Sequence, residues 1–200
     1  GWWRSRRGHI CKCDHAWSVL GMKRFVFLTV FFITNIFSAD SIYTQKDLVK
    51  LTDKFLGKPY IANTLSSYGE DEKLVVNFDA YDCFTFIDTI EALKRSSDLK
   101  SFKKELTKVR YKDSKITYKN RRHFFSDWLE SGRVADITCS LGACEKKKKF
   151  LNKDYKYLKD IKPKAVEVSY ITPQKINTSM LKSGDYVGIY TELDGLDVTH

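Results

Sequence analysis

The 200-residue sequence lacks internal repeats and any linker long enough to divide it, so we expect a single domain. It also lacks the Gly-rich modules and interleaved aromatic residues that accompany basic segments in nucleic-acid-binding proteins, which argues against a nucleic-acid partner. The cysteine pair Cys139 and Cys144 has no second pair nearby, as a structural zinc site would need, and we predict no metal site and no cofactor. The hydrophobic content of 42% is sufficient for a core.

Only one long apolar run is present, "FVFLTVFFITNIF", and it follows Met22, Lys23 and Arg24. A basic start, an apolar stretch and the small-residue exit "SAD" together predict a secretory signal peptide over residues 22–39, cleaved after Ala39. The run is short for a bilayer, so a retained anchor is the less favoured alternative. We therefore expect an exported protein, periplasmic or secreted, with no stable membrane anchor after cleavage.

Residues 1–21 precede that methionine and are interpreted as an upstream or artefactual extension. A metal cluster of His9, Cys11, Cys13 and His15 is the less favoured alternative, because this segment has no core pattern. Residues 40–200 then form the folded domain.

The formal net charge of +10 depends strongly on these first segments. Residues 1–39 carry six basic residues and one acidic residue, so residues 40–200 have a net charge of only +5. The densest basic run, "EKKKKF" at 145–150, is interpreted as a solvated loop or helix end. The charge is therefore too mild to indicate a polyanionic partner.

Three cysteines remain in residues 40–200, and they fall into two kinds. In an oxidising compartment Cys139 and Cys144, within "CSLGAC", could close a small local disulfide. Cys83 is then left as the odd thiol.

Periodicity predicts helices in the first part of the domain and antiparallel strands afterwards, an α+β order. The predicted helices cover residues 44–57, 82–95, 99–109 and 123–132, the last with Gly132 just after its end. The predicted strands cover residues 73–78, 165–171, 183–190 and 196–200.

Cys83 has two interpretations that the local pattern leaves open. A thiol among apolar residues is often a small core residue. However, Asp82 is a good N-cap, which would place Cys83 in the first turn of a helix. There the unpaired N–H groups and the helix dipole favour a thiolate and lower its pKa.

A thiolate nucleophile needs a base, and residues 40–200 contain only two histidines. His200 ends a predicted strand, a rigid position from which an imidazole could face a helix start. His123, within "NRRHFFSDW", is by default a surface or capping histidine or part of a ligand pocket. His200 is therefore the preferred base.

Four motifs in order carry a family resemblance: "FLGKPYIANTL", "VVNFDAYDCFTFIDTIEAL", "RRHFFSDWLESGRVADIT" and "LKSGDYVGIYTELDGLDVTH". Together they resemble the NlpC-type branch of papain-like cysteine peptidases and, within it, the bacterial N-acetylmuramoyl-L-alanine amidase-like family. The resemblance covers nearly all of residues 45–200. It implies a papain-like core in which the cysteine helix packs on an antiparallel sheet that carries the histidine.

The resemblance also implies roles for individual residues. Cys83 would be the nucleophile and His200 its general base, with Tyr60 and Asp82 lining the active site beside the oxyanion-binding helix start. The implied substrate is peptidoglycan or a muropeptide, cut at the amide between the muramyl lactyl group and L-alanine. The resemblance also implies residues that line the binding site for a sugar or stem peptide: Arg122, His123, Ser126, Asp127 and Trp128. Each of them could equally have a structural role, in a capped helix with an aromatic inner face.

The sequence departs from the family pattern at one end. Members continue past the histidine with further strands and a third polar residue that orients the imidazole, whereas His200 is the last residue here. We therefore expect a C-terminally truncated domain whose third catalytic residue lies beyond these residues. The alternatives left open are a cysteine endopeptidase that cuts the stem peptide and a catalytically silent domain that binds cell wall or glycan.

Overall fold

The computed structural model describes residues 2–4, 10–12 and 47–199, which belong to two separate units. In the first unit, β1 (Trp2–Arg4) and β2 (Ile10–Lys12) pair antiparallel, with Trp3 opposite Cys11. The signal peptide predicted for residues 22–39 lies outside the described residues and stays a prediction.

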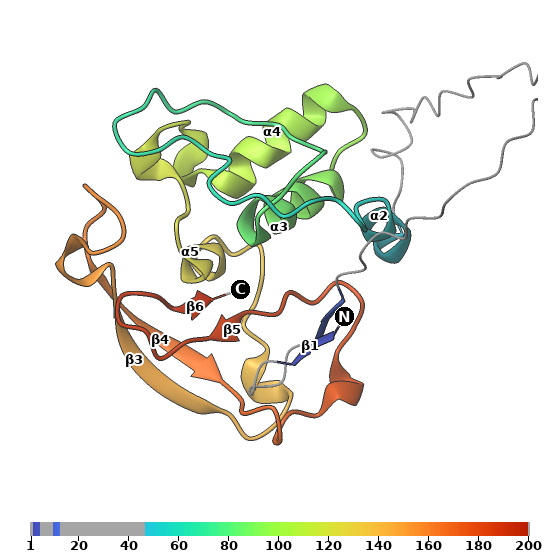
Figure 1. The fold of residues 1–200 in the computed structure, drawn as a ribbon, viewed down its shortest axis with the longest axis vertical. Coiled ribbons are helices and arrows are strands. Elements are labelled where there is room, and N and C mark those ends of the chain that lie inside the picture. The colour runs from blue at the N-terminus through green and yellow to red at the C-terminus, as the bar shows by residue number, and fades with distance from the viewer. Residues whose placement is uncertain (1, 5–9, 13–46, 200) are drawn as a thin grey trace, which may run out of the picture. The chain divides into compact units, whose positions relative to one another are not determined.

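The second unit carries its helices on one side and its strands on the other, with α5 between them (Figure 1). The helices are α2 (Leu48–Asp53), α3 (Cys83–Leu93), α4 (Leu99–Arg110) and α5 (Phe125–Glu130). Short 3-10 helices span Lys112–Ser114, Tyr118–Asn120, Thr138–Ser140, Lys153–Tyr155 and Thr178–Met180. The mixture of helices and antiparallel strands confirms the predicted α+β class.

Side-chain caps set where the helices start. Asp98 accepts a hydrogen bond from the Ser101 N–H at 2.7 Å, and the Ser101 hydroxyl accepts from the Asp98 N–H at 3.1 Å. This reciprocal pair satisfies two N–H groups that the helix itself cannot. It confirms the helix predicted at 99–109. The helix predicted at 44–57 is shorter in the structure: Asp47 is the N-cap, and α2 begins at Leu48 and ends at Asp53.

The helices enclose an apolar core. Side chains from four helices meet there, each less than about a tenth exposed, and they include Leu51, Ile90, Leu93, Phe102, Leu106, Val109 and Trp128. Burial of each large apolar side chain stabilises the fold by about 1.5–3 kcal/mol. Helix α3 is buried along most of its length, so its first residue is held by a rigid element.

Two antiparallel pairs form the strand side: β3 (Glu145–Leu151) with β4 (Lys164–Tyr170), and β5 (Ile189–Tyr190) with β6 (Val198–Thr199). Glu145 lies opposite Tyr170, and Leu151 opposite Lys164. Strand β4 confirms the prediction at 165–171. The strands predicted at 183–190 and 196–200 are present only as the short β5 and β6.

Two predictions of local structure were wrong. The run 145–150 is largely exposed, as predicted, but it forms a strand and not a loop or helix end, because it pairs in register with β4. Lys146 also forms an ion pair with Glu167 across the sheet at 2.9 Å. Residues 73–78 form no strand, because side chains take their carbonyl groups: the Arg110 guanidinium donates to Val75 O at 2.7 Å.

The loop between β3 and β4 is organised by Asn152, which is fully buried. Its side-chain amide donates to Leu158 O and Ile161 O at 2.7 and 2.6 Å, and its own N–H donates to Gly195 O at 2.9 Å. Gly195, at φ +86°, is required here, because a Cβ would lie 2.7 Å from the Tyr157 ring. One residue thus ties this loop to the turn between β5 and β6.

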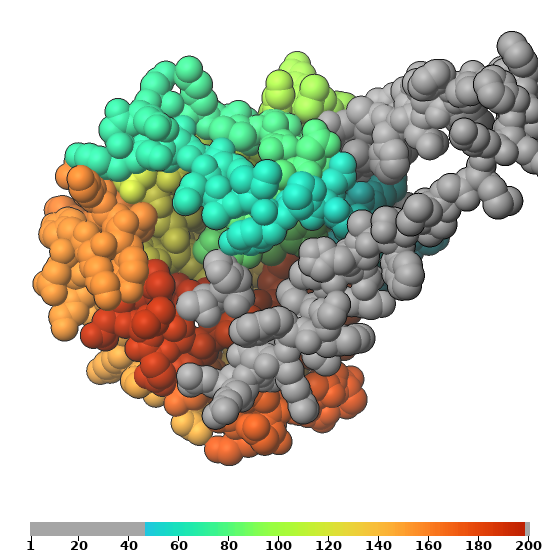
Figure 2. All heavy atoms as spheres, viewed as in Figure 1, coloured from blue at the N-terminus to red at the C-terminus, as the bar shows by residue number. Residues whose placement is uncertain are grey.

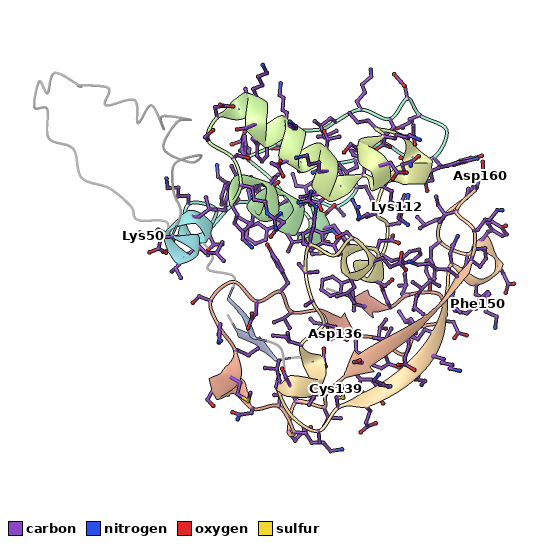
Figure 3. All side chains as sticks on the ribbon, turned by 180° about the vertical axis from the view of Figure 1, so that it is seen from behind. Lys50, Lys112, Asp136, Cys139, Phe150 and Asp160 are labelled. Carbon is purple, nitrogen blue, oxygen red and sulfur yellow. A yellow bond between two sulfur atoms is a disulfide. The ribbon has the colours of Figure 1, made fainter. Side chains whose placement is uncertain are left out.

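The structure joins Cys139 and Cys144 in a disulfide, with their Cα atoms 4.9 Å apart, which confirms the pairing suggested by the sequence (Cys139 is labelled in Figure 3). The closed loop is also held from outside, since Leu141 O accepts the Asn177 N–H at 2.8 Å. Among the described residues, none of the helices combines the length and apolar character needed to cross a membrane.

A buried ion pair between α3 and α4 supports the core, and its contribution to stability can be tested by removing one partner. Arg110 Nε donates to Asp88 at 2.9 Å, and both side chains are at most 5% exposed. We expect Asp88→Ala to lower the free energy of unfolding by about 3–5 kcal/mol, because it leaves a buried charge without its partner. Chemical denaturation measures this loss.

The matched control is Asp79→Ala, which removes the exposed Lys58–Asp79 pair at 3.2 Å. It should cost less than about 1 kcal/mol. Equal losses in the two variants would contradict the role given to Asp88.

Candidate active site

Cys83 is the first residue of α3, as the N-cap prediction required. Asp82 accepts the Thr85 N–H at 2.7 Å, and the Thr85 hydroxyl accepts the Asp82 N–H at 2.9 Å, which forms a capping box. Cys83 is a half-buried thiol outside the disulfide. The capped start therefore presents a thiol beside helix-start N–H groups, the geometry that a nucleophile with an oxyanion site needs.

The electrostatic setting of this thiol differs from the expectation. Burial and the Asp82 carboxylate raise the pKa of Cys83, and the backbone N–H groups of Phe84 and Cys83 lower it by less. The helix-start N–H groups therefore act in the predicted direction, but among the described groups burial and Asp82 outweigh them and leave the pKa above its ordinary value. A reactive thiolate at this position needs a positive partner in addition to the helix.

Tyr60 lies alongside the residues that precede Cys83. The segment around it runs parallel to Tyr81: the Tyr81 N–H donates to Pro59 O at 3.1 Å, and the Ile61 N–H donates to Tyr81 O at 3.0 Å. Burial, then the negative charges of Cys83 and Asp82, raise the pKa of the Tyr60 phenol. Tyr60, Asp82 and Cys83 are thus brought together from two separate motifs of the sequence.

Strand β6 leads to the predicted base. Val198 pairs with Tyr190 and Thr199 with Ile189, in register with β5. His200 lies outside the described residues, so its role stays a prediction. Gly188, just before β5, allows a close approach, because a Cβ there would lie 3.1 Å from Val198 and 3.4 Å from Phe125.

Contacts between side chains connect α3 with α5 and with the segment before β5. The Tyr186 hydroxyl donates to the buried Glu91 of α3 at 2.9 Å, and the Tyr186 ring packs edge-on against Trp128 of α5, with centroids 5.4 Å apart. The elements that hold Cys83 and that lead to His200 therefore share one packed network.

The sequence analysis missed Asp197, which completes that network. It is 3% exposed, and its carboxylate accepts the Ser126 N–H of α5 at 2.7 Å and the Val198 N–H of β6 at 2.9 Å. An aspartate between apolar residues in "GLDVTH" was the available signal, since a buried carboxylate must find donors. Asp197 fixes the start of β6 to the first turn of α5.

Three of the five predicted wall residues make structural contacts. Arg122 donates to Lys108 O at 2.9 Å and to Val109 O at 2.8 Å, so it caps the end of α4. Trp128 is 2% exposed and belongs to the core. Ser126 contributes its backbone N–H to Asp197. His123 and Asp127 remain, and both line a cavity.

This cavity has a volume of about 350 Å³ and lies where the end of α4, the start of α5 and the β3–β4 loop meet. We call it the basic cavity. Figure 3 labels two of its residues, Lys112 after α4 and Asp160 in the loop, on the same side of the molecule. Its remaining charged residues and its histidine are Lys119, Arg121, His123, Asp127, Lys162 and Lys164.

Asp127 is the buried acidic centre of the basic cavity. Its carboxylate accepts from Lys164 Nζ at 2.7 Å, from Lys112 Nζ at 2.9 Å, and from the backbone N–H groups of His123 and Phe124 at 2.9 and 3.0 Å. Burial alone would raise the pKa of Asp127, but the hydrogen bonds and charges of the two lysines hold it below its ordinary value.

His123 is held mainly by backbone contacts. Its Nε2 lies 2.8 Å from Tyr118 O, and its ring stacks at a tilt on Tyr118, with centroids 4.8 Å apart. Burial lowers the pKa of His123, and the nearby Arg121 charge adds to this. A neutral ring suits a cavity wall.

These features define an α+β domain with a capped cysteine helix and, beside α5, a basic cavity. Residues 50–200 match the family described as N-acetylmuramoyl-L-alanine amidase-like, and the chain belongs to that family. This confirms the narrower resemblance seen in the sequence. Membership supports a hydrolase that acts on peptidoglycan-type material.

Solved structures agree with this assignment. An N-acetylmuramoyl-L-alanine amidase from Bacteroides uniformis ATCC 8492 is 27% identical, with a TM-score of 0.58 over 78% of this chain and 77% of the amidase chain. The protein LPG0564 from Legionella pneumophila, at 21% identity and a TM-score of 0.64, covers 82% of this chain and 77% of its own and shares the fold. No curated protein matches this chain.

The role of Asp197 is testable through stability. We expect Asp197→Ala to lower the free energy of unfolding by roughly 1–3 kcal/mol, because it leaves the partly buried N–H groups of Ser126 and Val198 without this acceptor. The control Asp194→Ala removes an exposed carboxylate from the same turn and should change stability by less than about 0.5 kcal/mol. Indistinguishable denaturation midpoints for the two variants would refute the link.

Proposed function

We propose that this protein hydrolyses the amide between the N-acetylmuramoyl lactyl group and L-alanine in peptidoglycan or muropeptides, with Cys83 as the nucleophile. The observation that carries the proposal is the position of this thiol at the capped first residue of a buried helix, in a chain that belongs to the amidase-like family. The wider assignment to the NlpC-type, papain-like branch is part of the same proposal.

The chemistry follows the order of acyl transfer. The Cys83 thiolate attacks the amide carbonyl, a C–S bond forms, and the backbone N–H groups at the start of α3 stabilise the oxyanion. His200, which holds the proton taken from the thiol, gives it to the leaving L-alanine amine as the C–N bond breaks. Water, deprotonated by His200, then attacks the thioester, and the lactyl carboxylate and the Cys83 thiol are released.

The pKa of Cys83 explains why a histidine is needed. Burial and Asp82 hold the thiol in its neutral form, so the helix start alone does not produce a thiolate at neutral pH. An imidazolium beside the sulfur would stabilise the negative charge and reverse this shift. The link from α5 through Asp197 holds β6, the strand that precedes the proposed base, against α5.

Export is proposed from the leader predicted at residues 22–39. The Cys139–Cys144 disulfide supports it, because such bonds persist in oxidising compartments. A peptidoglycan substrate is also found outside the bacterial cytoplasm, so the two proposals agree.

The decisive experiment identifies the product. Purified muropeptides incubated with the protein should release a stem peptide whose free amine belongs to L-alanine, as seen by mass spectrometry. Cys83→Ala should lower kcat by roughly 10³-fold or more, because it removes the nucleophile. The control variant, Cys139→Ala with Cys144→Ala, keeps Cys83 and should retain cleavage.

Other products would replace the proposal. A shortened stem peptide would indicate a cysteine endopeptidase, whereas binding of muropeptides without any product would indicate a silent binding domain. Unchanged release by Cys83→Ala would refute the nucleophile.

A second prediction concerns the pH dependence of alkylation. In the parent protein the iodoacetamide reaction of Cys83 should follow a thiol pKa below the ordinary 8.5 or so, because the proposed imidazolium favours the thiolate. In His200→Ala the apparent pKa should rise above that value, since burial and Asp82 then dominate. Peptide mass spectrometry over pH 5–10 measures both curves. Superimposable curves would exclude His200 as the partner.

A further inference from the structure

The basic cavity combines three segments that are far apart in the sequence. Lys112 and His123 come from the chain between α4 and α5, Asp127 from α5, and Lys162 and Lys164 from the end of the β3–β4 loop and the start of β4. In Figure 2 the orange surface of this loop lies next to the olive surface around α5. A volume of about 350 Å³ falls within the range of small-ligand sites.

Its charge is predominantly positive. Five lysine or arginine residues line the cavity against two aspartates. Asp127 is shared between Lys112 and Lys164, and the latter also contacts Glu130 outside the lining at 2.8 Å. Lys119 reaches Asp160 only at 3.6 Å, in an exposed pair.

The other two cations differ in how they are held. Arg121 is fixed by Glu72 at 3.0 Å, behind the cavity wall. Lys162 is exposed, and its ammonium forms no ion pair with any residue in the described part of the chain. The cavity therefore has four cations held by carboxylates and one ammonium group, that of Lys162, without an ion pair among the described residues. This arrangement favours an anion over a neutral ligand.

The position of the cavity relates it to the proposed reaction. Within the first turn of α5, Ser126 donates its N–H to Asp197, which holds β6, and the next residue, Asp127, lines the basic cavity. One helical turn thus separates the strand that leads to His200 from the cationic wall.

We propose that the basic cavity is a subsite for carboxylate groups of the stem peptide. This inference rests on the proposed amidase function, in which the released peptide necessarily carries a C-terminal carboxylate. Lys162 supplies the group that contacts the carboxylate, while Asp127 keeps Lys112 and Lys164 in place. The subsite selects acidic peptides over their amidated forms.

The test compares binding of two peptides to the full-length protein by calorimetry. One is the stem peptide released from muropeptides, and the other is the same peptide with its carboxylates converted to carboxamides. The parent should bind the acidic form more tightly. Lys162→Glu should raise the Kd of the acidic form roughly ten- to hundredfold and leave that of the amide unchanged. Lys162→Ala should give a smaller rise.

Lys104→Glu is the matched control, because it makes the same charge change at an exposed position of α4 outside the cavity. It should leave both Kd values unchanged. Equal effects of Lys104→Glu and Lys162→Glu, or equal effects of Lys162→Glu on the two peptides, would overturn the subsite. Inorganic phosphate that binds the cavity without displacing the acidic peptide would overturn it as well, and would indicate an unrelated anion site.

Turnover of muropeptides separates this inference from the proposed function. Lys162→Glu should raise KM for acidic muropeptides with little change in kcat, because the subsite lies away from the reacting atoms. Cleavage by the parent with an unchanged KM in Lys162→Glu would overturn the subsite and leave the amidase proposal intact. Absence of cleavage by the parent would overturn the amidase proposal, and with it the assignment of the peptide as ligand.

Discussion

The arrangement of this domain depends on one buried carboxylate. Asp127 accepts four hydrogen bonds, from the lysine that follows α4, from the lysine that begins β4 and from two backbone N–H groups that precede α5. A buried carboxylate must be surrounded by donors, because an unpaired charge away from water costs several kcal/mol. The burial of Asp127 therefore requires the three segments that supply those donors to stay together.

The same constraint organises the site. Because α5 is held between the helices and the strands, its first turn can offer Ser126 to Asp197 on one side and Asp127 to the basic cavity on the other. Tyr186 adds a second connection, from Glu91 in the cysteine helix to Trp128 in α5. The proposed nucleophile and the strand of its proposed base are thereby placed by buried contacts and not by loops.

Burial and charge shift the pKa values of Cys83 and Asp127 in opposite directions at the two ends of the proposed site. At Cys83 burial and the Asp82 carboxylate outweigh the helix N–H groups and raise the pKa of the thiol. In the basic cavity the balance is reversed, because hydrogen bonds from lysines outweigh the burial of Asp127 and keep it ionised. The first environment suits a nucleophile that reacts only with its partner in place, and the second suits recognition of an anion.

The sequence by itself determined the features that depend on neighbouring residues. Asp82 predicts a helix start, since a short polar side chain caps the N–H groups of its own turn, and α3 begins where expected. Apolar spacing predicts α4, which begins at Leu99 as expected. The order of helices and strands, the Cys139–Cys144 pairing and the amidase-like family were also readable from local patterns.

Only the tertiary structure decided features that depend on distant partners. The basic run became β3 because β4 supplies an opposing strand, Arg122 and Trp128 turned inward because α4 and Tyr186 receive them, and Asp197 gained its role from a donor 71 residues away. Such contacts join residues through space, and no local spacing in the chain encodes them.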